Sequence, residues 1–401
     1  LYKMFKLISR TSFKINSSSF KYQHYYTTLT NNQKLRILFF GTDSFASTHL
    51  RALIKEKERQ GSCIATIDLV CPPDRRTGRK LEKITPSETK EIAERNNIEI
   101  YHTPAGIKTL NDWTLPNNKV YDLGIVVSFG YFIPPHIISS LNQGAINVHP
   151  SLLPKYRGAA PIQHTILYGD SEAGVTIQEL DDKEFDAGRI LAQERISLLS
   201  MNHDYPVYSK LKETLAEIGS RLLIDTVCNL YERKQNAQKQ DISQATKAPK
   251  VKKEWSELDF KNMSAWQAEQ LNRAIGDQFP LRTTYHKKKK NLIVQLLDLH
   301  LLSFNKKETI SLQQSEPGSF RWDEASKSLH IAFGDGSVIA CSKLKVENKG
   351  IISATDFANG YQAKGQFGTE SPLMQDDTII KNNIKKRSKM RRFDDRELNK
   401  T

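Results

Sequence analysis

The sequence predicts an α/β fold with a doubly wound, mainly parallel sheet, followed by a small OB-like β-barrel. Over residues 35–235, apolar runs typical of buried strands alternate with helical patterns. Over residues 255–365, short β-like segments are separated by turn residues. Residues 236–254 between them are polar and irregular, as in a linker. A chain of 401 residues is long enough to bury a core in each of the two predicted domains.

The first domain begins with RILFF at residues 36–40, a continuous apolar run that favours a buried parallel strand. Residues 41–44 favour a turn and a helix cap, and a helix is expected to reach about Arg59. Alternating strands and helices imply βαβ units, whose ligands bind beyond the carboxyl ends of the strands. The first turn lacks G-x-G-x-x-G, which argues against a dinucleotide cofactor. Further elements are expected at 65–71, 98–101 and 121–128 (strands) and at 87–96 and 206–231 (helices).

The residues expected to carry chemistry lie between 144 and 190. GAINVH has strand character and ends at Pro150, so alternation puts Asn147 and His149 on one face at the end of the strand. An amide donor beside an imidazole can stabilise a tetrahedral oxyanion. A second strand, GVTIQEL, leads into the acidic loop DDKEFDAG, which could bring a carboxylate to the histidine. A single histidine is often structural, so the spacing alone leaves open whether His149 has a catalytic or a structural role.

The run NVHPSLLPKYRGAAPIQ, followed by GVTI and DAG, resembles the signature of the formyltransferase family. RILFFGTDSFA, CPPDRRTGRKL and VVSFGYFIPP extend the resemblance, which covers roughly residues 35–365. It implies a Rossmann-like formyltransferase domain that uses 10-formyltetrahydrofolate as co-substrate and requires no metal. Matched by position, the family's catalytic residues fall on Asn147, His149 and Asp186. The acidic loop is one residue longer than is usual in the family, so Asp181 and Asp182 remain alternatives to Asp186.

The resemblance also implies an acyl transfer, in which an amine attacks the formyl carbon and the folate N10 leaves. An imidazolium at His149, favoured by the charge of Asp186, would stabilise the oxyanion, with Asn147 as the second donor. Asp186 would orient His149 and relay a proton through water. Phe129 replaces the usual tyrosine of the folate loop and keeps the ring. The folate-binding residues implied are Ser151, Leu152, Leu153 and Pro154, together with Val127, Phe129, Gly130 and Tyr131.

The net charge of +14 is concentrated at the two ends of the chain. Residues 1–34 carry six basic side chains and no acidic ones, residues 35–235 have a net charge of −1, and residues 236–401 have +9. A basic, hydroxyl-rich and acid-free first segment is typical of an organelle transit peptide, the alternative being an ordinary disordered tail. We therefore expect the protein in the mitochondrial matrix. The basic end, residues 366–401, is expected to be a disordered tail.

The second domain indicates which kind of molecule would accept the formyl group. A small basic barrel suits nucleic acid, although a solvated surface explains the charge equally well. Its strands are expected at LRTTYH, NLIVQLLDLHLL, SFRWD, LHIAF and SVIACSKL, with a hairpin turn at Asp335 and Gly336. This arrangement resembles methionyl-tRNA formyltransferases, so the resemblance implies methionyl-initiator-tRNA as the acceptor. Open alternatives are a sugar-amine or glycinamide ribonucleotide formyltransferase and a non-catalytic RNA-binding relative.

The loop CPPDRRTGRKLEK, residues 71–83, follows the second predicted strand and is strongly basic. In methionyl-tRNA formyltransferases the matching loop enters the acceptor end of the tRNA. The alternative is a mobile basic loop without a partner. The tRNA-binding residues implied by the resemblance are Arg75, Arg76, Arg79, Lys80 and Lys83.

The cysteines and the hydropathy exclude several classes of protein. The four cysteines form no CxxC pair, which argues against a zinc ribbon or a disulfide framework, and we expect them to be buried and without a role. No apolar run approaches the ~20 residues needed to span a bilayer, so no membrane partner is expected. We expect a monomer.

Overall fold

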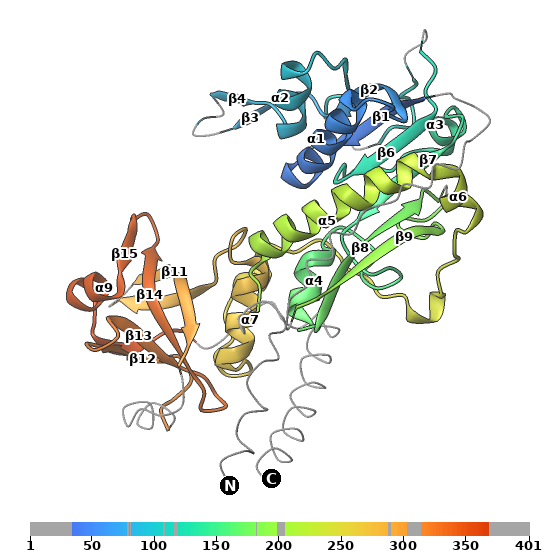
Figure 1. Cartoon of the computed structure of the whole chain (residues 1–401). Coiled ribbons are helices and arrows are strands. Elements are labelled where there is room, and N and C mark those ends of the chain that lie inside the picture. Colours follow the sequence, from blue (N-terminus) through green and yellow to red (C-terminus); the bar gives the residue numbers. More distant parts are fainter. Residues whose placement is uncertain are drawn as a thin grey trace, which may run out of the picture. The chain divides into compact units, whose positions relative to one another are not determined.

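Figure 1 shows the computed structural model of the chain, which describes residues 34–77, 80, 82–106, 109–115, 119–181, 183–198, 205–287, 290–302 and 314–368. Lys34 and the residues after it belong to one compact unit. The predicted transit peptide, apart from Lys34, and the predicted tail beyond Gly368 lie outside the described residues.

A seven-stranded sheet forms the centre of the described first domain, in the order β5-β2-β1-β6-β7-β8-β9. The strands from β5 to β7 are parallel, as predicted, whereas β8 and β9 extend the sheet in antiparallel fashion. The sheet is therefore mainly parallel, and the carboxyl ends of five strands meet at one edge. The strands are β1 (Leu35–Gly41), β2 (Ile64–Cys71), β5 (Ile100–His102), β6 (Leu123–Val127), β7 (Ala145–His149), β8 (Glu172–Glu179) and β9 (Ile190–Ser197).

Helices flank this sheet, and none of the described ones has both the length and the apolar character needed to cross a bilayer. Asp43 caps the first helix by accepting a hydrogen bond from the Ala46 amide at 3.1 Å, as the sequence predicted. Buried Leu50 and Leu53 place one face of α1 in the main core. The helices are α1 (Ser44–Glu58), α2 (Glu88–Arg95), α3 (Pro135–Ser139), α4 (Pro161–Leu167), α5 (Tyr208–Cys228) and α6 (Leu230–Gln235).

His49 is a fully buried histidine where α1 packs on α5. Its Nδ1 lies 2.7 Å from the Phe45 carbonyl oxygen, and its Nε2 has no hydrogen-bond partner among the described residues. Gly219 of α5 makes room for the ring, since a Cβ there would lie 2.8 Å from Nε2. Burial lowers the pKa of His49 from 6.5 to about 4. The fold is therefore built around the neutral imidazole.

This histidine predicts a loss of stability in acid. The unfolded chain binds the proton near pH 6.5 and the folded chain only near pH 4, so stability is complete above pH 6.5 and falls until about pH 4. At about 1.4 kcal/mol per pH unit the loss is roughly 3 kcal/mol. Thermal unfolding of wild type and His49→Leu across this range measures it, because the variant should show a flatter pH dependence. An identical pH dependence in both proteins would contradict the assignment.

The second domain is a nearly closed antiparallel barrel, in the order β10-β11-β14-β13-β12-β16, with β15 paired to β14. A bridge between Tyr285 and Phe367 joins the two ends of this path. Gly336, with φ of +80°, forms the predicted turn between β13 and β14. Phe367 is buried, so the folded chain passes the predicted boundary at 365. The elements are β10 (Arg282–Lys287), β11 (Lys290–Leu301), β12 (Ser319–Asp323), β13 (Ser328–Ala332), β14 (Val338–Val346), β15 (Ile351–Ser353), α9 (Ala354–Gly360) and β16 (Lys364–Gln366).

The polar segment between the domains packs along the first domain. Gln238 exchanges backbone hydrogen bonds with Ile190 at 2.8 and 2.9 Å, and Ala248 donates to the Arg157 carbonyl at 2.7 Å. The segment contains two short 3-10 helices, η2 (Ile242–Gln244) and η3 (Lys253–Ser256), and is followed by α7 (Ala265–Ile275). Its polar composition suggests an irregular connection and does not indicate that the connection contacts the loop between β8 and β9.

Candidate active site

The end of β7 places Asn147 and His149 in one cavity. They are two residues apart, so their side chains lie on the same face of the strand. In the pairing of β7 with β8, Asn147 lies opposite Gln178 and His149 lies opposite Thr176. His149 is almost completely buried, whereas Asn147 is half-buried. The edge at which both side chains lie is the one where ligands bind in parallel sheets.

Asp186 comes from the loop between β8 and β9 and lies at the centre of these side chains. Its Oδ1 accepts hydrogen bonds from Asn147 Nδ2 at 3.3 Å and Gln178 Nε2 at 3.1 Å, and it lies 3.4 Å from His149 Nδ1. Its Oδ2 accepts from the Gly158 amide at 2.8 Å. Three side-chain nitrogens therefore converge on a single anionic oxygen.

Of the alternatives for the carboxylate, the structure brings Asp186 to His149. Asp181 instead accepts from the amides of Lys183 and Glu184, both at 2.9 Å, and so stabilises the turn. Asp182 lies outside the described residues. Asp186 has φ of +57°, a left-handed conformation that aspartate tolerates better than most residues. Gly188 follows closely, and a Cβ there would lie 1.8 Å from the Glu179 carbonyl oxygen, so only glycine lets the loop return along β8.

The imidazole of His149 is held on both sides. Its Nε2 lies 2.9 Å from the Tyr156 carbonyl oxygen, while Nδ1 faces Asp186. Carbonyl and carboxylate oxygens only accept, so the ring lies between two acceptor oxygens. The two contacts together fix the orientation of the imidazole.

Gln240, from the polar segment after α6, supports the loop that carries Asp186. Its Nε2 lies 2.9 Å from the Asp186 carbonyl oxygen and 2.8 Å from that of Gly188. Arg157 donates to its Oε1 at 2.7 and 3.1 Å. The sequence analysis missed Gln240 because nothing in a polar linker marks one glutamine. It also missed Gln178, which a polar residue within the apolar strand GVTIQEL could have revealed.

The cavity around these residues has a volume of about 730 Å³, within the usual range for small-molecule sites. Phe129, Gly130 and Tyr131 line it, together with their neighbour Phe132. Val127 is fully buried and does not line it. The expected residues Ser151, Leu152, Leu153 and Pro154 are also not among its lining residues.

The segment after His149 instead supports the end of β7. The Leu153 amide donates to Thr176 Oγ1 at 3.2 Å, and Thr176 Oγ1 donates to the Ser151 carbonyl at 2.7 Å. The side chain of Leu152 lies close to Gly174, where an added Cβ would be 2.4 Å from it. These contacts bind the segment to β8, so it orients the strand that carries His149.

Aromatic rings form part of the cavity wall. Phe129 and Tyr131 lie 5.0 Å apart, and Phe132 meets Phe185 edge-on at 5.1 Å. Phe185 is 58% exposed, although it precedes Asp186 directly in the loop that lines the cavity. The lining also includes Asp43 and Lys212, whose ion pair at 2.8 Å joins the start of α1 to α5. Flat apolar walls with a few charged groups suit a planar heteroaromatic ligand.

The basic loop after β2 forms a two-stranded hairpin, β3 (Arg75–Thr77) and β4 (Lys83–Thr85), labelled in Figure 1. The side chains of Arg75, Arg76, Lys80 and Lys83 are exposed, and Arg79 lies outside the described residues. Asp74 is held by Lys90 at 2.8 Å, so its charge is already paired. Because the hairpin follows the carboxyl end of β2, it leaves the sheet at the edge where β7 presents His149.

Comparison with known proteins matches both domains in order. The formyl transferase family matches residues 34–227, and the formyl transferase C-terminal domain matches residues 250–362. The mitochondrial methionyl-tRNA formyltransferase of Rattus norvegicus is 33% identical over 331 residues, which covers 81% of this chain and 78% of the relative. The methionyl-tRNA formyltransferase of Limosilactobacillus fermentum is 34% identical over 327 residues, which covers 81% of this chain and 95% of the relative.

Among solved structures, the N-formyltransferase of Helicobacter canadensis, crystallised with folinic acid and dTDP-3-aminofucose, has a similar fold. It superposes with a TM-score of 0.51 at 16% identity, covering 77% of this chain and 98% of that one. At this identity the likeness concerns the fold alone.

Proposed function

Because the chain belongs to the formyltransferase family and its relatives across both domains are methionyl-tRNA formyltransferases, we propose that it formylates methionyl-initiator-tRNA. The formyl group comes from 10-formyltetrahydrofolate and is transferred to the α-amino group of the methionyl residue. The convergence of Asn147, His149 and Gln178 on Asp186 is the observation that carries the proposal for the site.

The donors around Asp186 can stabilise the charge that develops during the reaction. When the neutral amine attacks the formyl carbon, the carbonyl π electrons move to oxygen and create an oxyanion. The Asn147 amide has a second N–H besides the one that faces Asp186, and His149 Nδ1 lies 3.4 Å from the same carboxylate, so both side chains lie where the oxyanion would form. Preorganised donors need no reorganisation during the reaction, which is the main source of their effect.

Asp186 would carry out the proton transfers that the reaction requires. The attacking nitrogen must lose a proton, and the folate N10 must gain one as its bond to the formyl carbon breaks. Asp186 can accept the first proton directly or through water and can pass it to N10 as that bond breaks, since its carboxylate lies beside the imidazole in the cavity. The oxyanion then returns its electrons to re-form the carbonyl, which releases formylated tRNA and tetrahydrofolate.

The co-substrate would bind against the aromatic wall. Phe129, Tyr131 and Phe132 offer flat apolar surfaces to its pteridine ring, and Gly130, with φ of +77°, brings the backbone of this loop into the cavity. The segment from Ser151 to Pro154 would act indirectly, by holding β7 and therefore His149 in place.

Gln240 would act as a positioning residue for Asp186. We expect Gln240→Ala to lower kcat by about tenfold, since it removes both hydrogen bonds to the loop backbone, and to leave the KM for folate nearly unchanged. Gln240→Glu should recover little of the lost kcat, because a carboxylate cannot donate hydrogen bonds to these carbonyls. Steady-state kinetics with Gln244→Ala, an exposed glutamine of the same segment, provides the matched control. A Gln240→Ala variant with normal kcat would show that the segment does not position the loop.

The site of action would be the mitochondrial matrix. The mitochondrial relatives and the basic, acid-free residues 1–34 support this location, although bacterial relatives are equally similar. A reporter fused to residues 1–34 should enter mitochondria, and mutation of the basic residues in this segment to glutamine should prevent it. A reporter that stays in the cytosol would remove the mitochondrial assignment and leave the activity unaffected.

An acceptor panel tests the proposed function. Purified protein lacking residues 1–34 is supplied with labelled 10-formyltetrahydrofolate and one of three acceptors: methionyl-initiator-tRNA, an aminosugar nucleotide or glycinamide ribonucleotide. We expect label only on the tRNA. Transfer to a small acceptor, with none to tRNA, would refute the proposal and favour another activity of the family.

A further inference from the structure

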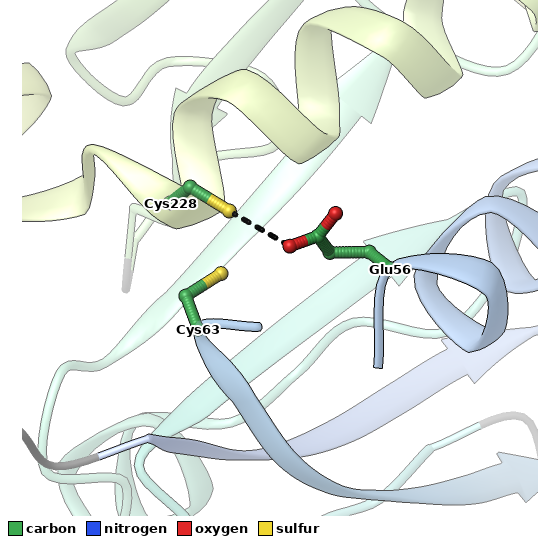
Figure 2. A group of neighbouring side chains, drawn as sticks. All are labelled: Glu56, Cys63 and Cys228. Carbon is green, nitrogen blue, oxygen red and sulfur yellow. Dashed lines mark hydrogen bonds between the residues drawn. The ribbon is translucent and has the colours of Figure 1, made fainter. Parts of the chain in front are cut away.

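Side chains from three separate elements meet at the edge of the sheet opposite the candidate active site. Figure 2 shows Glu56 from the last turn of α1, Cys63 just before β2 and Cys228 at the end of α5. One oxygen and two sulfur atoms of these residues all lie within 4.8 Å of one another. The sequence analysis expected the cysteines to be without a role, because no local spacing pairs them. We propose that these residues form a binding site for a soft, tetrahedral divalent cation such as zinc.

The spacing of the three atoms fits this coordination. With bonds of about 2.3 Å to sulfur and about 2.0 Å to oxygen at a tetrahedral angle, a zinc-bound S···O pair is separated by about 3.5 Å. Cys228 Sγ lies 3.6 Å from Glu56 Oε1. Both cysteines are partly exposed, so water can reach the fourth position. Two thiolates with one carboxylate form a ligand set suited to zinc rather than to magnesium or calcium.

Neighbouring groups hold two of the three side chains in place. Arg59 donates to both oxygens of the buried Glu56, with contacts between 2.7 and 3.1 Å, which orients the carboxylate as an outer-shell partner does. A divalent ion and Arg59 together would balance two thiolates and one carboxylate. Cys63 is held by the backbone of β1, whose Leu35 amide donates to its carbonyl at 2.8 Å. The cation would connect α1, β2 and α5.

A disulfide is the competing chemistry for two close sulfurs. Disulfide formation needs an oxidant that removes two electrons, which nothing in the formyl transfer reaction supplies. A disulfide would also give Glu56 no role.

Cobalt binding to the reduced full-length chain tests the site. Cobalt(II) is added after treatment with a chelator, and we expect thiolate-to-cobalt absorption in the near ultraviolet, saturation at one ion per chain and loss of the band on adding zinc. Cys63→Ser and Cys228→Ser should lose the band, whereas Cys341→Ser, in the barrel core, should keep it. All three variants should keep formyl transfer activity, because they lie away from the cavity; this separates failure of the cation site from failure of the proposed function.

A second measurement uses the wild-type protein, in case a variant does not fold. Zinc should protect Cys63 and Cys228 from alkylation, as mapped by mass spectrometry, and a chelator should remove this protection. The proposal is overturned if cobalt gives no thiolate band, if both serine variants retain the band, or if the unreduced protein contains a Cys63–Cys228 disulfide and binds no metal.

Discussion

Asn147→Ala should lower kcat by roughly 10²–10³, the usual cost of removing one donor to a developing oxyanion. Its Nδ2 lies 3.3 Å from the oxygen around which the site is built. His149→Ala and Asp186→Ala should be at least as damaging, because His149 supplies the other donor and Asp186 both orients it and takes the proton. Single-turnover rates with saturating folate and methionyl-tRNA measure the chemical step directly.

Combined substitutions show whether the three residues act as a unit. If they do, the double variants should be little slower than the worst single variant. Asp182→Ala is the matched control on the same loop, and we expect it to retain most of its activity. Near-normal turnover by His149→Ala would refute the mechanism. An inactive Asp182→Ala beside an active Asp186→Ala would move the carboxylate role and leave the rest of the mechanism intact.

Replacing Arg75, Arg76 and Arg79 together with alanine should weaken tRNA binding strongly and leave folate binding intact. Arg75 and Arg76 are exposed on the hairpin at the carboxyl edge of the sheet, where the acceptor end of the tRNA would arrive. Each lost phosphate contact should reduce the slope of log affinity against log salt by about one. Affinity measured at several salt concentrations tests this.

A second triple variant distinguishes the effect of where the basic residues lie from the effect of the total charge removed. Arg51, Lys55 and Lys57 are exposed on α1, and replacing them with alanine removes the same charge. We expect this control to bind tRNA with nearly the wild-type salt slope. If the hairpin variant also keeps its affinity and slope, the basic barrel is the main tRNA-binding surface and the hairpin is not.

The sheet and the barrel could be predicted because they depend on local patterns, whereas the set of Asn147, His149 and Asp186 came from the resemblance to the formyltransferase family. Continuous apolar runs marked the parallel strands, and the alternation in GAINVH placed Asn147 and His149 on one face. The extra residue in the acidic loop left open which aspartate approaches His149, and the structure places the Asp186 carboxylate 3.4 Å from His149 Nδ1. The antiparallel β8 and β9 were not foreseen as such, because strand direction depends on the connection.

Contacts between residues far apart in the chain could not be predicted from the sequence. Gln240 lies in a segment whose composition indicates only a linker, yet it contacts the loop of Asp186. Ser151 to Pro154 match the family motif but do not line the cavity, and Thr176 binds the backbone of Ser151 and Leu153 to β8. Cys63 and Cys228 lack any sequence spacing that would pair them, and only the packing of α5 against α1 and β2 brings them together.

Identification of the product tests the central claim most directly. Protein lacking residues 1–34 is incubated with 10-formyltetrahydrofolate and methionyl-initiator-tRNA, the aminoacyl ester is hydrolysed, and the released amino acid is analysed by mass spectrometry. The proposed chemistry predicts N-formylmethionine from the wild-type protein and almost none from His149→Ala in the same time. Unmodified methionine from the wild-type reaction, while the folate is consumed, would contradict it.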